Sequence, residues 1–188
     1  MTIYLIRHGL TTANEQHLYC GSTDLPLSEK GRQALGNRPP VDVGNARFIT
    51  SGMRRCSETL NLLFGDVPCE VVTDFREINF GMFEMKSYQQ LRDDPAYQAW
   101  LSGDPEITAP PGGESGEEMK ARVLNGFHAI QKAGRDTVIV THGGVIAAIM
   151  ENLFPEEGKN RYQWQPKPGC GYALAGGTNE AIPFAGEP

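Results

Sequence analysis

Three short apolar runs in this chain end on basic or imidazole side chains, and this repeated arrangement limits what the chain can fold into. The runs cover residues 3–6, 46–50 and 137–141, and they lead into the sequences RHG, SGMRR and HGG. Continuous apolar runs with β-branched and aromatic members are typical of strands buried on both faces. Stretches that favour helices follow two of them, over residues 53–64 and 145–154. This alternation predicts an α/β fold with a mostly parallel central sheet.

The remaining segments fit the same alternating pattern. Ser28 is a predicted helix N-cap, and Ser115 with Glu118 forms a predicted capping box. We expect further helices over 28–37, 88–93, 95–102 and from Ser115 onward, strands over 70–73 and 172–174, and loops over 9–27, 74–86 and 105–113. The segment after Gly176 is rich in Gly, Pro and Ala, so we expect residues 177–188 to be a loosely ordered tail on a single domain that spans residues 1–188.

Composition excludes several classes of protein. With 188 residues, 39% of them apolar, the chain is long enough to bury one sizeable core. We expect a cytoplasmic protein, because there is no transmembrane run, no secretion signal and no C-x-x-C pair among four scattered cysteines. A net charge of −6 without any Lys/Arg-rich run argues against a nucleic-acid partner. No Cys/His cluster has zinc-like spacing, so we expect neither metal nor cofactor. The oligomeric state stays open.

The three strand ends predict a site for a phosphate-like anion. In open α/β sheets, ligands bind beyond the carboxyl ends of the strands. If the three strands are close together, His8, His142 and at least two arginines meet in one place. Arginine matches phosphate oxygens in a bidentate manner, and glycines after each histidine let a ligand approach the backbone. Each motif alone is more often ordinary surface, but three at corresponding junctions favour a site.

The order of these motifs is that of a known family. The chain contains R-H-G-x-T-x-x-N at 7–14, S-x-x-x-R at 51–55, R-E-x-x-F-G-x-F-E at 76–84, P-G-G-E-S at 111–115 and T-H-G-G at 141–144. As a set, and in this order, they resemble the histidine phosphatase superfamily, the phosphoglycerate-mutase-like phosphohydrolases. The resemblance implies a three-layer α/β/α fold around a mostly parallel sheet. It also implies a cytoplasmic hydrolase that acts on a small phosphomonoester.

Carried over by residue, the resemblance implies a role for each matching position. His8 is similar to the family's nucleophile, which takes the phosphoryl group onto a ring nitrogen and forms a phosphohistidine. Glu77 is similar to the acid that protonates the leaving oxygen and then activates water, and His142 to the second imidazole. The implied phosphate-binding residues are Arg7, Arg55, Asn14 and Gly143. A neutral imidazole is a competent nucleophile near pH 7, and two arginines can spread the phosphoryl charge without a metal.

The loop before the first helix bears on the substrate. Residues 19–35 (YCGSTDLPLSEKGRQAL) resemble the α-ribazole phosphatase branch, which acts on α-ribazole 5′-phosphate in cobalamin biosynthesis. We therefore assign Cys20, Gly21 and Ser22 to a substrate loop. The run also occurs in broad-specificity phosphatases and in fructose-2,6-bisphosphatase-like members, so a broad-specificity phosphatase remains an alternative. A phosphoglycerate mutase is a weaker one, and a non-catalytic phospholigand-binding protein is the weakest.

Four positions leave room for other interpretations. Arg54 competes with Arg55 for the phosphate, and we favour Arg55 because its spacing from Ser51 matches the family. Glu77 could instead pair with its neighbour Arg76. Met85 stands where the family usually has glycine, which bears on the conformation of the loop around Glu77 and hence on the shape of the substrate.

Overall fold

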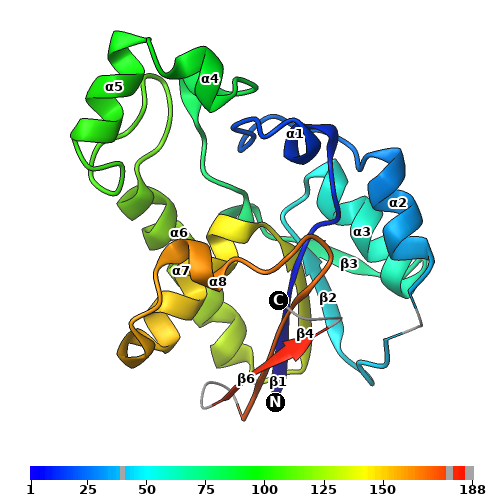
Figure 1. The fold of residues 1–188 in the computed structure, drawn as a ribbon. Coiled ribbons are helices and arrows are strands. Elements are labelled where there is room, and N and C mark those ends of the chain that lie inside the picture. The colour runs from blue at the N-terminus through cyan, green and yellow to red at the C-terminus, as the bar shows by residue number, and fades with distance from the viewer. Residues whose placement is uncertain (39–40, 177–179, 185–188) are drawn as a thin grey trace.

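The computed structural model describes residues 1–38, 41–176 and 180–184, and these residues build three layers around a mixed sheet (Figure 1). The strands are β1 (Thr2–Arg7), β2 (Arg47–Thr50), β3 (Cys69–Val71), β4 (Thr137–Thr141), β5 (Gly171–Ala175) and β6 (Glu180–Phe184). The α-helices are α1 (Thr12–Glu15), α2 (Glu29–Gly36), α3 (Arg54–Phe64), α4 (Tyr88–Leu91), α5 (Pro95–Ser102), α6 (Gly116–Ala133), α7 (Gly143–Leu153) and α8 (Arg161–Trp164). Short 3₁₀ turns lie at Thr73–Phe75, Gly81–Phe83 and Pro155–Glu157.

Strand order places the three expected strand ends at one edge. The sheet runs β3-β2-β4-β1-β5-β6, and β3, β2, β4 and β1 are parallel to one another. β4 therefore lies between β1 and β2, so the carboxyl ends of all three strands meet. β5 and β6 extend the sheet in antiparallel fashion beyond β1. The predicted α/β fold with a mostly parallel sheet is confirmed.

Alternating strand residues pack against helices on opposite faces. Ile3 and Leu5 of β1 face α6 and α7 in one apolar cluster, whereas Ile6 joins α2 and α3 in the other. Figure 1 shows the two helix groups on either side of the sheet. A third, smaller cluster of Phe83 and residues from α4 and α5 supports the lobe that stands above the carboxyl edge. The carboxyl edge of the sheet is therefore supported from below by packed side chains, and this lobe stands above it.

Helix starts follow the predicted caps. The Ser28 hydroxyl accepts a hydrogen bond from the Gly31 amide, and Ser115 and Glu118 form the reciprocal capping box at the start of α6. The expected loop over residues 9–27 instead contains α1, because Thr11 and Asn14 form a further capping box that was not anticipated. The short helix α8 was also missed, and Asn160 caps it in the same way.

The end of the chain differs from the expectation where it can be described. Residues Glu180–Phe184, part of the segment expected to be loosely ordered, form strand β6 and pair with β5. Residues 177–179 and 185–188 lie outside the described residues. Among the described residues, no helix has the length and apolar character needed to cross a membrane.

Gly171 is a position where the sheet requires glycine. A Cβ atom there would lie 1.8 Å from the Leu5 carbonyl oxygen of the neighbouring strand β1. We expect Gly171→Ala to lower the free energy of unfolding by about 3 kcal/mol, because β1 and β5 would have to separate. Urea denaturation monitored by circular dichroism measures this change.

The matched control is Gly36→Ala, since a Cβ atom at Gly36 meets nothing within 4 Å. Alanine is also the better helix former, so this variant should be as stable as the parent or up to about 1 kcal/mol more stable. Equal stability of the two variants would contradict the close approach of β5 to β1.

Candidate active site

The carboxyl edge of the sheet brings the two predicted histidines together. The His8 amide donates to the Thr141 carbonyl at 2.9 Å, which joins the end of β1 to the end of β4. The His8 and His142 rings then lie 5.2 Å apart between centroids, at 64° to each other. The expectation that these strand ends meet is confirmed by the strand order and by this contact.

His8 is held in one tautomer. Its Nδ1 atom lies 2.7 Å from the Gly9 carbonyl oxygen, which can only accept, so Nδ1 carries the proton and Nε2 keeps a lone pair. Burial, followed by the charges of Arg55 and Arg7, lowers the pKa of His8 well below its ordinary value, although the bond to Gly9 opposes this shift. The side chain is only 5% exposed. A neutral imidazole in this fixed orientation can act as a nucleophile through Nε2.

Arg55 is fully buried and has a partner at each guanidinium nitrogen. Nη1 donates to the Thr23 carbonyl at 2.8 Å, Nη2 to the Gly21 carbonyl at 2.7 Å, and Nε to His142 Nδ1 at 3.2 Å. Arg54, its competitor in the sequence, is exposed, and its guanidinium lies 3.8 Å from Glu58. Of the two arginines, Arg55 is therefore the one beside the histidines, where it ties the loop around Gly21 to His142.

His142 has protein partners at both ring nitrogens. Because Nδ1 accepts from Arg55, Nε2 carries the proton and lies 2.9 Å from the Ser51 hydroxyl. Burial, then Arg55 and the neighbouring His8 and Arg7, lower the pKa of His142 well below its ordinary value. A contact between His142 and a transferred group therefore requires one of these hydrogen bonds to be exchanged. Sequence reasoning gave Ser51 no role, although it begins the S-x-x-x-R motif.

The Arg7 guanidinium has a hydrogen-bond donor that is left without a partner. Its Nη1 donates to the Pro166 carbonyl at 2.9 Å, while its buried Nε has no partner among the described residues. Burial lowers the pKa of Arg7, and the nearby Glu77 carboxylate opposes this shift. Gly143 lies directly against this guanidinium, since a Cβ atom there would come within 3.2 Å of Arg7 Cζ. The free donor and the first turn of α7 together suit an anion.

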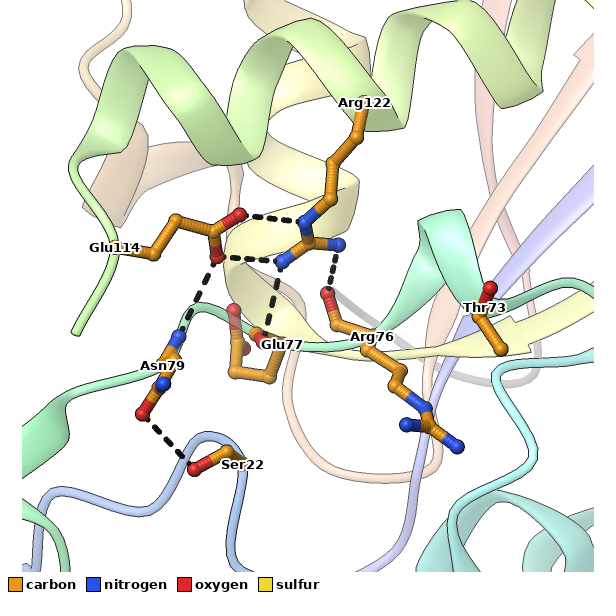
Figure 2. Close-up of a pocket in the computed structure, with 7 residues that line it drawn as sticks. All are labelled: Ser22, Thr73, Arg76, Glu77, Asn79, Glu114 and Arg122. Atoms are coloured by element: carbon orange, nitrogen blue, oxygen red, sulfur yellow. Dashed lines mark hydrogen bonds and ion pairs between the residues drawn. The ribbon is translucent and has the colours of Figure 1, made fainter. Parts of the chain in front are cut away.

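Glu77 lies at the start of α7. Its Oε2 accepts from the Gly144 amide at 3.0 Å, and a Cβ atom on Gly144 would lie 2.4 Å from Oε1, so a larger residue there would displace the Glu77 carboxylate. Figure 2 shows the Glu77 and Arg76 side chains pointing in different directions. Arg76 Nε instead donates to the Ser51 carbonyl at 3.3 Å. The alternative of a Glu77–Arg76 salt bridge is therefore not seen among the described residues.

A half-buried carboxylate that sequence reasoning missed, that of Glu84, fixes the loop that contains Cys20, Gly21 and Ser22. Glu84 accepts hydrogen bonds from the amides of residues 21, 22, 23 and 80 and from the Thr23 hydroxyl. Burial alone would raise the pKa of Glu84, but these hydrogen bonds outweigh it and lower the pKa. Glu84 closes the R-E-x-x-F-G-x-F-E motif, and that position was the available signal.

The backbone conformation at Met85, the residue after Glu84, explains why the family usually has glycine at this position. Its φ of +59° lies in the left-handed region that glycine adopts without strain. Its amide nevertheless donates to the Tyr19 carbonyl at 2.7 Å. The chain therefore keeps this backbone conformation with methionine at the position.

Two cavities flank Glu77. The larger, of about 450 Å³, is lined by Arg7, Asn14, Cys20, Glu77 and Gly144 together with several aromatic side chains. The smaller, of about 300 Å³, contains Ser22, whose hydroxyl donates to the Asn79 side chain at 3.0 Å (Figure 2). The predicted substrate loop is thus divided, with Cys20 facing the larger cavity, Ser22 the smaller one, and Gly21 buried between them.

Metal ligation has little support in this arrangement. Among residues 1–38, 41–176 and 180–184, no group of three or more His, Cys, Asp or Glu side chains is placed to hold a metal ion. Asn14 lines the larger cavity, but its side-chain oxygen already accepts from the Thr11 amide and hydroxyl at 3.0 Å each. The side-chain NH₂ group is what Asn14 can offer to a ligand.

Comparisons with known proteins agree with the geometry. The model of the histidine phosphatase superfamily (branch 1) matches residues 3–179. An adenosylcobalamin/alpha-ribazole phosphatase of Salmonella typhimurium is 29% identical, over 93% of this chain and 90% of that protein. The crystal structure of the alpha-ribazole phosphatase from Shigella flexneri matches with a TM-score of 0.86 and 25% identity over 99% and 96% of the two chains. A phosphoglycerate mutase structure from Thermus thermophilus matches with a TM-score of 0.77 and 27% identity over the full length of both.

The lowered pKa values of His8 and His142 predict a pH-dependent stability. Both imidazoles stay neutral in the folded protein below pH 6.5, whereas in the unfolded chain each takes up a proton near that pH. The unfolded state then binds more protons, so the free energy of unfolding should fall as the pH is lowered from about 7.5 to about 5.5, by at most about 1.4 kcal/mol per pH unit for each group.

Urea titrations across this pH range measure the slope, and ¹⁵N NMR of the imidazoles reports the protonation state directly. At pH 6 the folded protein should show His8 neutral and protonated on Nδ1. A doubly protonated His8 or His142 at that pH would contradict the account.

Proposed function

This chain belongs to branch 1 of the histidine phosphatase superfamily and is a phosphatase, and from that premise we propose that it is a metal-independent phosphomonoesterase that works through a phosphohistidine at His8. The observation that carries the proposal is the orientation of His8. Its Nδ1 is bonded to the Gly9 carbonyl, so the Nε2 lone pair is free, and Arg7 with its unpaired Nε lies next to it in the chain. A nucleophile and an anion-binding group thus lie together at a rigid strand end.

The first half of the proposed reaction forms the phosphoenzyme. The Nε2 lone pair of His8 attacks phosphorus while the bond from phosphorus to the alcohol oxygen breaks, and Glu77 gives its proton to that oxygen. Arg7, the Asn14 amide and the backbone at Gly143 hold the phosphoryl oxygens. An alkoxide is a poor leaving group, so proton donation by a carboxylic acid lowers the barrier.

The second half returns the enzyme to its starting state. Glu77, now a carboxylate, takes a proton from water while that water attacks phosphorus and the bond to Nε2 breaks, which releases inorganic phosphate. Arg55 and His142 contribute to both halves of the proposed reaction. Arg55 supplies positive charge from beneath the site, and His142 contacts the transferred group once its bond to Arg55 or to Ser51 is exchanged.

The substrate we propose is α-ribazole 5′-phosphate. Names of the relatives support it, as does the resemblance of residues 19–35 to that branch. The cavity of about 450 Å³ is of the size that holds a whole small organic molecule, which suits an ester with a large alcohol part. A cytoplasmic location belongs to the same proposal.

Phosphoglycerate mutase activity is the weaker alternative because of charge. A phosphoglycerate carries a carboxylate that needs its own cation. Among the described residues that line the larger cavity, the arginines are Arg7 and Arg161. Arg161 is paired with Glu106 at 2.8 Å and keeps an unpartnered Nε, but Glu106 and Asp104 in the same lining set two carboxylates against this one cation. A broad-specificity phosphatase remains compatible with the site, whereas a pure binding protein would have no need for Glu77 beside the nucleophile.

His8→Ala should abolish turnover of p-nitrophenyl phosphate in the presence of a chelator, because the variant lacks the attacking nitrogen. The parent protein should keep full activity with the chelator. Release of p-nitrophenol, followed by absorbance, measures both, and His17→Ala at an exposed loop position is the matched control. Full activity of His8→Ala would overturn the proposed mechanism.

The same preparation separates the alternatives. With 3-phosphoglycerate we expect neither isomerisation nor rapid release of phosphate, whereas α-ribazole 5′-phosphate should yield one phosphate per α-ribazole. Isomerisation of phosphoglycerate faster than phosphate release would favour the mutase.

A further inference from the structure

A large part of the lining of the larger cavity is apolar and aromatic. Besides Arg7, Asn14 and Glu77, which suit a phosphate, the lining includes Leu18, Tyr19, Phe80, Trp100, Leu101 and Tyr162. A phosphate group alone would leave this aromatic part of the cavity, of about 450 Å³ in all, unoccupied. The rest of the substrate must therefore match a surface rich in aromatic rings.

One wall of this aromatic part is rigid. The Tyr19 and Phe80 rings meet edge to face at 5.0 Å between centroids, and the Tyr19 and Tyr97 hydroxyls lie 2.5 Å apart. The Trp100 indole donates to the Thr108 carbonyl at 2.9 Å. These contacts fix the wall before any ligand binds, which lowers the entropy lost on binding.

Tyr162 of α8 also lines the larger cavity, and it is 80% exposed. The helix that carries it is held in place, because Asn160 caps the helix, Arg161 pairs with Glu106, and Trp164 is buried against Phe154 and Tyr172. The Tyr162 ring is therefore anchored through its backbone and available to a ligand in the cavity.

Tyr162 and Tyr19 face the same space. Burial, the hydrogen bond to Tyr97 and the nearby Tyr97 and Tyr162 hydroxyls raise the pKa of Tyr19. Arg161 keeps a buried Nε without a partner among the described residues, but its other two nitrogens bind Glu106, and Asp104 adds a second carboxylate, so these three side chains together carry more negative than positive charge. The space therefore suits an uncharged ring rather than a second phosphate or a carboxylate.

We propose that Tyr162, together with Tyr19 and Phe80 in the lining of the same cavity, forms a slot for a planar, uncharged aromatic ring on the alcohol part of the phosphomonoester. Tyr162 is then a specificity-determining residue. The proposal rests on the proposed phosphatase function and adds to it the residues that select the substrate.

Two substrates that differ only in the ring test this slot. α-Ribazole 5′-phosphate and ribose 5-phosphate share the ribose and the phosphate, so the ratio of their kcat/KM values isolates the ring. The parent protein should favour the ring-bearing ester, and Tyr162→Ala should lower the ratio on the order of tenfold by slowing that ester alone. Tyr162→Phe should keep the ratio, and Tyr88→Ala, at a tyrosine 59% exposed outside the cavity lining, is the matched control.

The outcomes separate the two proposals. Equal kcat/KM for both esters in the parent, or an unchanged ratio in Tyr162→Ala, would overturn the slot while leaving the phosphatase intact. Hydrolysis of neither ester, nor of p-nitrophenyl phosphate, would overturn the proposed function itself.

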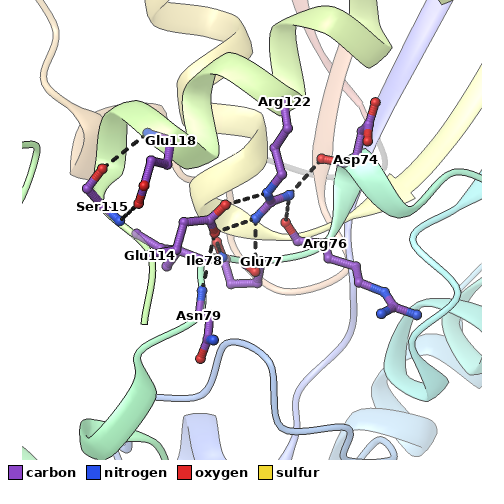
Figure 3. Close-up of polar contacts among 9 residues, drawn as sticks. All are labelled: Asp74, Arg76, Glu77, Ile78, Asn79, Glu114, Ser115, Glu118 and Arg122. Carbon is purple, nitrogen blue, oxygen red and sulfur yellow. Dashed lines mark hydrogen bonds and ion pairs between the residues drawn. The ribbon is translucent and has the colours of Figure 1, made fainter. Parts of the chain in front are cut away.

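A separate observation concerns the loop that bears Glu77. Arg122 on α6 donates to three backbone carbonyls of that loop: Nη1 to the Asp74 and Arg76 carbonyls at 2.7 Å each, and Nη2 to the Glu77 carbonyl at 3.3 Å (Figure 3). The guanidinium also binds Glu114 in a bidentate pair, with Nε at 2.7 Å and Nη2 at 2.8 Å. Every guanidinium nitrogen thus has a partner, and Nη1 and Nη2 hold this loop against α6.

The geometry points to Arg122 as a positioning residue for Glu77. Three carbonyls on one guanidinium fix the backbone from which the Glu77 side chain reaches Gly144, and the Glu114 carboxylate orients the guanidinium. The inference rests on the proposed role of Glu77 as acid. Arg122 itself does not touch the reacting atoms.

Dependence on the leaving group tests this role. p-Nitrophenolate leaves without a proton, whereas an alkyl phosphate needs the acid, so Glu77→Gln should slow hydrolysis of the alkyl ester far more. Arg122→Gln, Arg122→Lys and Glu114→Gln should show the same selective loss, about tenfold, and combining Arg122→Gln with Glu77→Gln should add little further loss. Arg47→Gln, which removes a remote arginine near Glu70, is the control.

Equal losses for both esters in the Arg122 variants, or fully additive losses in the double variant, would indicate a merely structural role and overturn the inference. If Glu77→Gln itself shows no preference between the esters, the proposed acid fails instead.

Discussion

The buried Arg55 guanidinium is the interaction on which the rest of the site depends. It lies where three parallel strands end, and it donates to the carbonyls of Gly21 and Thr23 and to His142. These bonds hold the loop of residues 21–23 at the sheet edge through its carbonyls, while Glu84 binds the amides of the same loop. A charge buried in this way is stable only because each donor is satisfied. Removing it would release the loop and one ring nitrogen of His142 together.

This buried charge also contributes to the protonation state of the site. Burial is the largest cause that lowers the pKa of His8 and of His142, and the charges of Arg55 and Arg7 lower both further, so both imidazoles are neutral where an anion is proposed to bind. In the proposed mechanism, a neutral His8 retains the lone pair that attacks phosphorus, and the arginines retain the charge that attracts the phosphate. The charged groups that are costly to bury at this edge of the sheet are then the same groups that would bind the ligand.

Sequence patterns predicted the parts of this molecule that depend on local rules. Apolar runs located β1, β2 and β4, and the residues that follow them located His8, Arg55 and His142. Contacts between distant segments were beyond such rules: Ser51 meeting His142, Glu84 gathering the amides of residues 21–23, and Arg122 holding the loop of Glu77. The short helices α1 and α8 were missed because four residues give no periodicity, and β6 was missed because pairing with β5, rather than composition, defines it.

The most direct test of the account is the position of the phosphoryl group in a trapped intermediate. Rapid quenching of the protein with ³²P-labelled substrate into alkali, which preserves phosphohistidine, followed by peptide mapping and ³¹P NMR, identifies both the residue and the ring nitrogen. Since Nδ1 of His8 is bonded to the Gly9 carbonyl, the account predicts phosphate on Nε2 of His8. Phosphate on Nδ1, on His142 or on no histidine at all would contradict it.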